Sequence, residues 1–243
     1  MPDQRLRDTW LIRRREALEL LVVYVVFTVA WFVVGWVLTR PLKNSVIVHG
    51  DQSAAEWFVE RRTPRLDSLS FAGSMLSETI VKVIVTAIVA LAMLIAWKRW
   101  LEPLVVVVAL ILEALSFITI TALVGRNRPD VPHLDSSPVG SSYPSGHVGA
   151  AVAYSAIVVV IFWHTRRRWI RALSVVIAVA IPVCVALARL YRGMHFVTDV
   201  VFGALLGTAS VVATVIVLKR AAKRQGVQIE IDESEPVPDL VSS

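Results

Sequence analysis

Long apolar runs and short polar connections alternate along the whole chain. Six runs are long enough to cross a bilayer as helices of about 20 residues. They cover residues 18–38, 79–97, 101–124, 147–163, 172–188 and 194–218. The fourth and fifth runs are the shortest, so their limits are the least sharply marked. The pattern predicts an all-α fold, a six-helix integral membrane bundle.

The connection between the first two runs, residues 40–78, is long enough to hold structure of its own. Ser53 and Glu56 fit a capping box, with Trp57 and Phe58 on the helix that follows. Such a helix lies at the bilayer interface, covers a site, or simply connects two spans. Residues 68–77 form a second short apolar piece before the second run.

Composition agrees with a membrane protein. The chain has 243 residues, of which 56% are hydrophobic and 18% charged, and its mean hydropathy is +0.66. A soluble domain of this length is less apolar. Because the first run follows an arginine-rich start, a signal peptide is an alternative. The run is too long for that and lacks a clear small-residue cleavage site, so we expect an uncleaved anchor.

Four basic clusters predict the orientation of the bundle. They precede the first run, follow the second, follow the fourth and follow the sixth: Arg5, Arg7, Arg13, Arg14 and Arg15; Lys98 and Arg99; Arg166, Arg167, Arg168 and Arg171; Lys219, Arg220, Lys223 and Arg224. With six spans all four clusters fall on one side, which should be the cytoplasm. We therefore expect a basic cytoplasmic N-terminus (1–17), a six-span domain (18–218) and a cytoplasmic tail (219–243). The tail has little apolar content, which predicts disorder.

The net charge of +6 and the isoelectric point near 9.9 are also typical of nucleic-acid-binding proteins. Here the cations lie where the membrane topology requires them, so no nucleic-acid partner is predicted. The expected surroundings are membrane lipids, with the protein as a multi-pass protein of the cell membrane.

Three short motifs border apolar runs on the side opposite the basic clusters. They are Arg126-Asn127-Arg128-Pro129, Pro144-Ser145-Gly146-His147, and Arg189 followed by His195 and Asp199. Ionisable groups at membrane depth are costly and mark candidate functional sites. The motifs therefore predict one site at the outer membrane face.

These residue types suit phosphate ester hydrolysis, which needs a nucleophile, a proton donor and cations. His195 and Asp199 are four residues apart, which on a helix places them on one face. The carboxylate could then hold one imidazole nitrogen while the other attacks phosphorus. His147 could protonate the leaving group and later activate water.

Phosphate binding is assigned to the remaining motif residues. Arg128 and Arg189 carry planar, permanently charged guanidinium groups that match phosphate oxygens. The backbone N–H groups of Ser145 and Gly146 are expected at a helix N-terminus, which favours anions. Metal binding by His147, His195 and Asp199 is the alternative, but the fixed arginines would repel a metal ion. We therefore predict no metal and no cofactor.

Two features of the spans are not part of these motifs. Glu113, deep in the third run, is either protonated or paired with Lys82. Gly203 and Gly207 form a G-x-x-x-G pair, which allows another helix to approach closely. Packing within one chain is favoured over dimerisation.

The motifs resemble signatures of the type 2 phosphatidic acid phosphatase superfamily, over residues 121–199. P-S-G-H and R-x5-H-x3-D are similar to its second and third signatures, and Arg128-Pro129 to the end of the first, K-x6-R-P. Thr121 stands where the first signature has lysine, and Ala188 where the third has serine. The resemblance implies a phosphohistidine intermediate on His195 and a lipid phosphate or diphosphate as substrate.

The Thr121 departure predicts a missing cation, which Lys82 or Arg126 could replace. The function expected is a lipid phosphate phosphatase of the outer leaflet, with phosphatidate, phosphatidylglycerol phosphate and polyprenyl diphosphate as candidate substrates. A lipid phosphotransferase on the same scaffold and a non-catalytic head-group binder or transporter are the alternatives. The sequence leaves the lipid and the oligomeric state open.

Overall fold

The computed structural model describes residues 12–76, 78–136 and 140–227, and within them the chain is helix, turn and loop. The helices are α1 (Arg14–Thr39), α2 (Val46–Glu60), α3 (Pro64–Met75), α4 (Thr79–Trp97), α5 (Leu101–Val124), α6 (Gly146–Ala153), α7 (Ala156–His164), α8 (Arg168–Tyr191) and α9 (Val197–Arg224). The predicted all-α fold is confirmed.

Six helical segments are long and apolar enough to cross a membrane, as predicted. The helices α4 and α5 have the predicted limits, and α1 and α8 extend beyond their apolar runs at both ends. The helix α9 begins three residues after the predicted start at 194 and extends beyond the predicted end at 218. The fourth span consists of α6 and α7, separated by a short break at Tyr154 and Ser155. The Tyr154 hydroxyl donates to the carbonyl of Lys82 at 2.8 Å, so the break is bound to α4.

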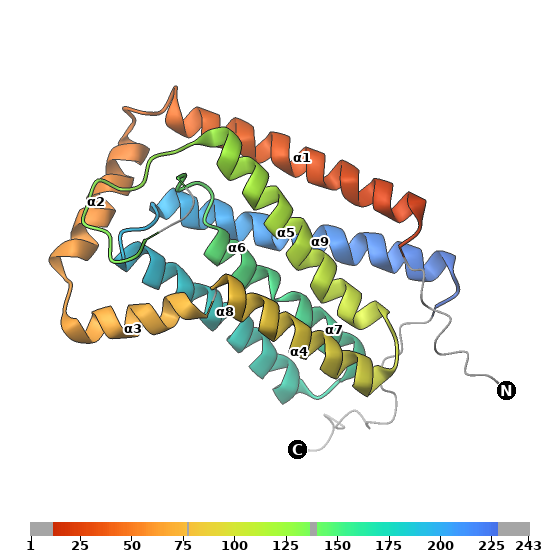
Figure 1. Ribbon diagram of the computed structural model, residues 1–243. Helices are drawn as coiled ribbons and strands as arrows, with labels where there is room; N and C mark the ends of the chain where they lie inside the picture. The colour runs from red at the N-terminus through yellow and green to blue at the C-terminus, as the bar shows by residue number, and fades with distance from the viewer. Residues whose placement is uncertain (1–11, 77, 137–139, 228–243) are drawn as a thin grey trace, which may run out of the picture.

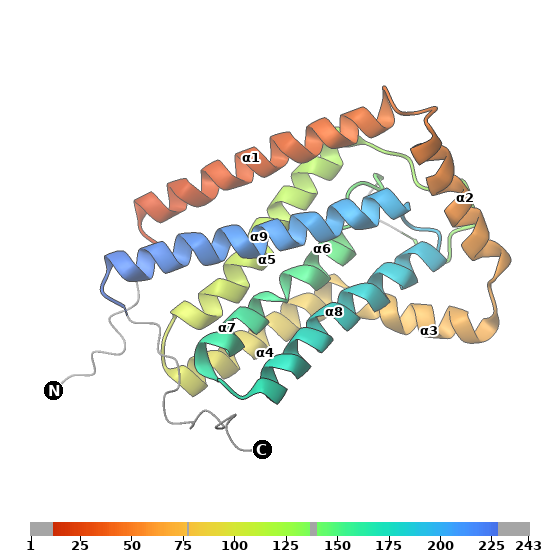
Figure 2. The same cartoon turned by 180° about the vertical axis from the view of Figure 1, so that it is seen from behind.

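The centre of the bundle is formed by α5, α6 and α9 (Figures 1 and 2), with α1 packed along α5 and α9. Glycines allow α6 and α9 to approach closely. A Cβ atom on Gly203 would lie 3.1 Å from the carbonyl carbon of Ser145, and one on Gly207 would lie 2.9 Å from Cβ of Val152. The predicted packing of this glycine pair within one chain is therefore confirmed.

The helices α2 and α3 cross one end of the bundle (Figure 1). The predicted capping box at Ser53 and Glu56 is wrong, because both residues lie inside α2. The helix begins earlier, after Ser45, whose side chain accepts a hydrogen bond from the N–H of Val48. Thr63 caps α3 in the same way. Both helices pack on the spans, α2 on α8 and α9 and α3 on α8.

The opposite end of the bundle holds the start of α1 and the end of α9 (Figure 2). Arg224 joins the two helices through ion pairs with Glu16 at 2.6 Å and Glu19 at 2.9 Å. The sixth span therefore continues six residues past its predicted end at 218. The rest of the predicted tail from residue 228 onward, and Arg5 and Arg7 at the other terminus, lie outside the described residues.

Candidate active site

A pocket of about 380 Å³ lies at the end of the bundle that α3 crosses. Among the predicted site residues, those that line it are Lys82, Arg128, Gly146, His147, Arg189 and His195. They come from four separate stretches of the sequence, around residues 82, 128, 146–147 and 189–195. Three cations and two carboxylates, Glu78 and Asp135, face this space, so its charged walls have a net positive charge.

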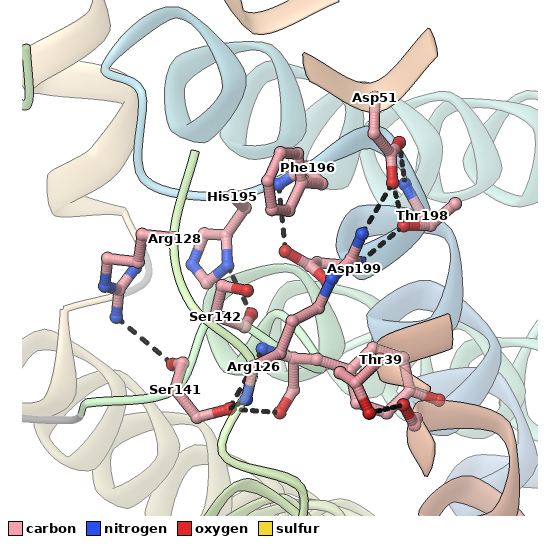
Figure 3. A network of polar contacts seen from close by, with 12 residues as sticks. Thr39, Asp51, Arg126, Arg128, Ser141, Ser142, His195, Phe196, Thr198 and Asp199 are labelled. Carbon is pink, nitrogen blue, oxygen red and sulfur yellow. Dashed lines mark hydrogen bonds and ion pairs between the residues drawn. The ribbon is translucent and has the colours of Figure 1, made fainter. Parts of the chain in front are cut away.

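His195 lies between α8 and α9 and is 4% exposed. Its Nδ1 is 2.7 Å from the carbonyl oxygen of Ser142, as Figure 3 shows. Because a carbonyl can only accept, Nδ1 carries the proton and Nε2 keeps its lone pair. Burial, together with the guanidinium groups of Arg189 and Arg128, holds the pKa of His195 well below its ordinary value. The imidazole is therefore neutral at pH 7, as a nucleophile must be.

Asp199 does not occupy the position expected from its spacing to His195. The helix α9 begins at Val197, so His195 precedes it and the two residues do not share a helical face. The Asp199 carboxylate instead turns back and accepts from the N–H of Phe196 at 2.9 Å. The carbonyl of Ser142, and not the Asp199 carboxylate, accepts the hydrogen bond from the His195 imidazole. Sequence reasoning missed Ser142 because no spacing rule identifies a loop carbonyl.

Arg126 does not line the pocket. Its guanidinium group is ion-paired with Asp199 at 2.5 Å and with Asp51 of α2 at 2.9 Å. Asp51 also accepts from the hydroxyl of Thr198 at 2.5 Å, which ties α2 to the start of α9 (Figure 3). We call Arg126, Asp51, Asp199 and Thr198 the Arg126 cluster. Because its charge is already matched by two buried carboxylates, Arg126 is not retained as a phosphate ligand.

Thr121 also lies away from the pocket. Its hydroxyl donates to the carbonyl of Tyr143 at 3.1 Å, which anchors the loop before Pro144. Of the two cations considered as replacements for a lysine at this position, only Lys82 lines the pocket.

Arg128 and Arg189 reach the pocket from different elements, the segment after α5 and the end of α8. Arg128 donates to the carbonyls of Met194 and Ser141, which fixes its side chain beside His195. Arg189 donates through one terminal nitrogen to Ser74 of α3 at 2.8 Å and to Asp135 at 2.9 Å. Both arginines are thus held rigidly on the pocket wall.

Asp135 is a site residue that the sequence did not reveal. It also accepts two hydrogen bonds from Arg192, at 2.7 and 2.6 Å. Burial tends to raise the pKa of Asp135, but the hydrogen bond from Arg192 and the charge of Arg189 outweigh it, and the net pKa is lowered. Asp135 is therefore ionised, and it orients Arg189.

The Pro144-Ser145-Gly146-His147 motif at the start of α6 is only partly arranged as predicted for phosphate binding. The N–H of Ser145 donates to the backbone carbonyl of Asp199 at 2.9 Å, so it does not face a ligand. Gly146 lines the pocket, and a Cβ atom there would lie 2.7 Å from the ring of Phe117. His147 projects into the pocket, with Nε2 at 3.6 Å from a carboxylate oxygen of Glu78.

Among the described residues of the pocket wall, Nε2 of His147 and Nε of Arg189 are buried without a hydrogen-bond partner. Unpaired buried polar atoms are rare in proteins, and each needs an explanation. A bound phosphate ester supplies acceptor oxygens for such groups. Within the described part of the chain, no group of three or more His, Cys, Asp or Glu residues is placed to hold a metal ion.

Comparisons with known proteins concern the family and the fold of the chain. The family model of the PAP2 superfamily matches residues 102–223, half of the chain. A solved structure of a transmembrane PAP2-type phosphatidylglycerolphosphate phosphatase from Bacillus subtilis is similar, with 23% identity and a TM-score of 0.66 over 81% of this chain and 96% of that one. LpxE from Aquifex aeolicus aligns with 24% identity and a TM-score of 0.50 over 68% of this chain and 92% of that one. No curated protein sequence matches the chain. At these identities the structural likeness shows the fold.

Proposed function

The chain belongs to the PAP2 superfamily and is a multi-pass membrane protein of the phosphatase fold, and we propose that it hydrolyses a lipid phosphate or diphosphate through a phosphohistidine on His195. One observation carries the proposal. A buried, neutral histidine, held by its Nδ1, shares a cationic pocket with a second histidine. Such a pair provides the nucleophile and the proton donor for phosphoryl transfer.

The positions of the side chains support the following reaction. Nε2 of His195 attacks phosphorus and the bond from phosphorus to the leaving oxygen breaks. His147 gives its proton to that oxygen, which leaves as the lipid alcohol or monophosphate. A carboxylate oxygen of Glu78 lies 3.6 Å from Nε2 of His147 and places a negative charge beside this proton donor. His147, now neutral, takes a proton from water as the water oxygen attacks the phosphohistidine, and inorganic phosphate is released.

Electrostatic stabilisation comes from fixed cations. Arg128, Arg189 and Lys82 face the pocket from three different segments. Charge that builds up on the phosphoryl oxygens during attack is stabilised by such preorganised groups without rearrangement.

The location of the pocket supports a lipid substrate at the outer leaflet. The pocket lies at one end of the membrane-spanning helices. The described members of the four basic clusters border the start of α1, the α4–α5 and α7–α8 connections and the end of α9, which lie at the other end of the bundle (Figure 2). Cytoplasmic loops are enriched in Lys and Arg, so the pocket is assigned to the extracytoplasmic side. Cysteines introduced at Asp130 and at Lys223 test this side, because only the first should react with an impermeant thiol reagent outside intact cells.

The decisive experiment measures inorganic phosphate released from a panel of lipid phosphates by purified protein. Wild type should release phosphate and form an acid-labile phosphoprotein, whereas His195→Ala should do neither. His147→Ala should lose turnover but retain some phosphoprotein with substrates that have good leaving groups. Wild-type turnover by His195→Ala would end the phosphohistidine proposal. Transfer of phosphate to an added alcohol in preference to water would indicate a phosphotransferase.

A further inference from the structure

A groove of about 370 Å³ between α4 and α5 continues from the catalytic pocket. It shares Thr79 and Lys82 with the pocket and extends along α4 to Ala90, about 16 Å along the helix axis. We call it the α4/α5 groove. A second apolar cavity on the other side of α4, towards α7 and α8, shares no described lining residue with the catalytic pocket. Continuity therefore favours the α4/α5 groove as the place where the rest of a lipid substrate lies.

The α4/α5 groove contains a buried polar side chain without a partner. Glu113 lines it and is 2% exposed, and its Oε1 is buried without a hydrogen bond. Its carboxyl is accommodated by Gly149 of α6, where a Cβ atom would lie 3.1 Å from Cδ of Glu113. Thr86, another polar residue of the groove, already bonds to the carbonyl of Lys82 at 2.7 Å. Glu113 is thus a polar group of this groove whose buried oxygen has no hydrogen-bond partner among the described residues.

The environment of Glu113 determines its hydrogen-bonding capacity. No ion pair joins it to Lys82 or to another cation in the described part of the chain. An ionised carboxyl without a cation is costly among apolar side chains at membrane depth. The protonated form avoids that cost and has one O–H donor. Of the two states that the sequence left open, the geometry supports the protonated one.

The depth of Glu113 matches a particular part of a lipid. Glu113 is one helical turn from Phe117, which lines the catalytic pocket, so it lies about 6 Å further along α5. In a glycerophospholipid, two or three carbon atoms separate the phosphate ester oxygen from the nearest acyl ester, whose carbonyl is an acceptor. In a polyprenyl phosphate, only hydrocarbon follows the phosphate.

We propose that the α4/α5 groove binds an acyl chain of a glycerophospholipid substrate, and that Glu113 donates a hydrogen bond to its ester carbonyl. This inference rests on the proposed function and specifies its substrate class. Apolar side chains of α4 and α5 hold the chain, and Lys82 lies where the groove joins the phosphate pocket. Glu113 is a specificity residue in this scheme and takes no part in the chemistry.

The test compares diacyl phosphatidate with its dialkyl ether analogue, which lacks the carbonyls, in mixed micelles. Wild type should prefer the diacyl lipid about three- to tenfold in kcat/KM, the size of one ordinary hydrogen bond. Glu113→Leu should bring this ratio to about one, and Glu113→Gln, which keeps a donor, should retain most of it. A wild-type ratio of one, or an unchanged ratio in Glu113→Leu, would overturn the inference while leaving the phosphatase proposal intact.

A pair of cavity-filling variants tests the groove without changing Glu113. Ala87→Phe places a ring in the α4/α5 groove, and Ala178→Phe places one in the cavity on the other side of α4. The first should slow hydrolysis of long-chain relative to short-chain phosphatidate, and the second should not. The reverse result would move the acyl chain to the other cavity and overturn the inference. If wild type releases no phosphate from any lipid, the proposed function itself fails.

Discussion

Two arginines of a single motif, Arg126 and Arg128, have opposite surroundings. Arg126 is enclosed by two carboxylates in the Arg126 cluster, whereas Arg128 lines a pocket beside neutral His195. In the cluster the cation is neutralised by the protein itself. In the pocket, Nε of Arg189 and Nε2 of His147 are buried without a hydrogen bond to any described residue. The difference shows two uses of an arginine: Arg126 binds two buried carboxylates, whereas Arg128 lies on the wall of the pocket.

The largest effects are expected from two variants: Arg126→Gln should mainly lower stability, and Arg189→Gln should mainly lower activity. Arg126→Gln leaves Asp51 and Asp199 buried without their cation, so it should cost about 3–5 kcal/mol of stability. Arg189→Gln removes a charge that stabilises the transition state and should lower kcat about a hundred- to a thousandfold. It should cost less stability, because Asp135 keeps Arg192 as a partner.

Thermal unfolding in detergent and phosphate release at a temperature where both variants are folded provide the two measurements. A stable Arg126→Gln protein with low activity would indicate that Arg126 binds the phosphate. An unstable Arg189→Gln protein whose folded fraction is fully active would make Arg189 structural.

Much of the fold follows from the sequence because it depends on local properties. Apolar runs of sufficient length gave the limits of α4 and α5, and helix-bordering motifs gave the histidines and arginines of the pocket. Spacing failed at His195 and Asp199, because one residue of the pair precedes the helix. A boundary error of a few residues was enough to change a hydrogen-bond partner.

The carboxylates could not be predicted in the same way. Asp51, Asp135 and Glu78 lie in connecting segments or at a helix start, and their partners are distant in the sequence. No periodicity or motif relates such residues. Only the folded chain shows that Asp51 binds Arg126 away from the pocket and that Asp135 binds Arg189 on the pocket wall.

Lys82→Met should have the next largest effect. Lys82 lines the pocket, and Thr121 stands where related sequences are expected to have a lysine, so Lys82 should supply the charge. A charge-assisted contact with phosphate contributes roughly 1.5–3 kcal/mol, which is about ten- to a hundredfold in kcat/KM. Lys223→Met, at the other end of the bundle, is the matched control. Equal kcat/KM for the two variants would mean that the missing lysine is simply tolerated.

A smaller effect is expected on the pH dependence of phosphoprotein formation, which should report the charges around His195 in the pocket. Protonation of His195 stops its attack on phosphorus, and burial with the charges of Arg189 and Arg128 holds its pKa well below the ordinary 6.5. The acidic loss of activity due to His195 should therefore occur below pH 6.5. Removing a cation in Arg189→Gln should raise the pKa and move that loss to higher pH. Single-turnover labelling across pH measures this, and an unchanged profile would contradict the electrostatic coupling.

Metal removal should have the smallest effect of all. Three cationic side chains already face the phosphate position, and they would repel a divalent ion while replacing its electrostatic role. Phosphate release should therefore stay within about twofold of its starting value in excess EDTA, with a magnesium-dependent phosphatase in the same detergent as the control. Complete loss, restored by a divalent ion, would contradict this. A carboxylate oxygen of Glu78 and Nε2 of His147 lie 3.6 Å apart on the pocket wall, so these two residues would then be the first metal ligands to test. Glu78→Gln should weaken the metal requirement only if the Glu78 carboxylate holds the ion.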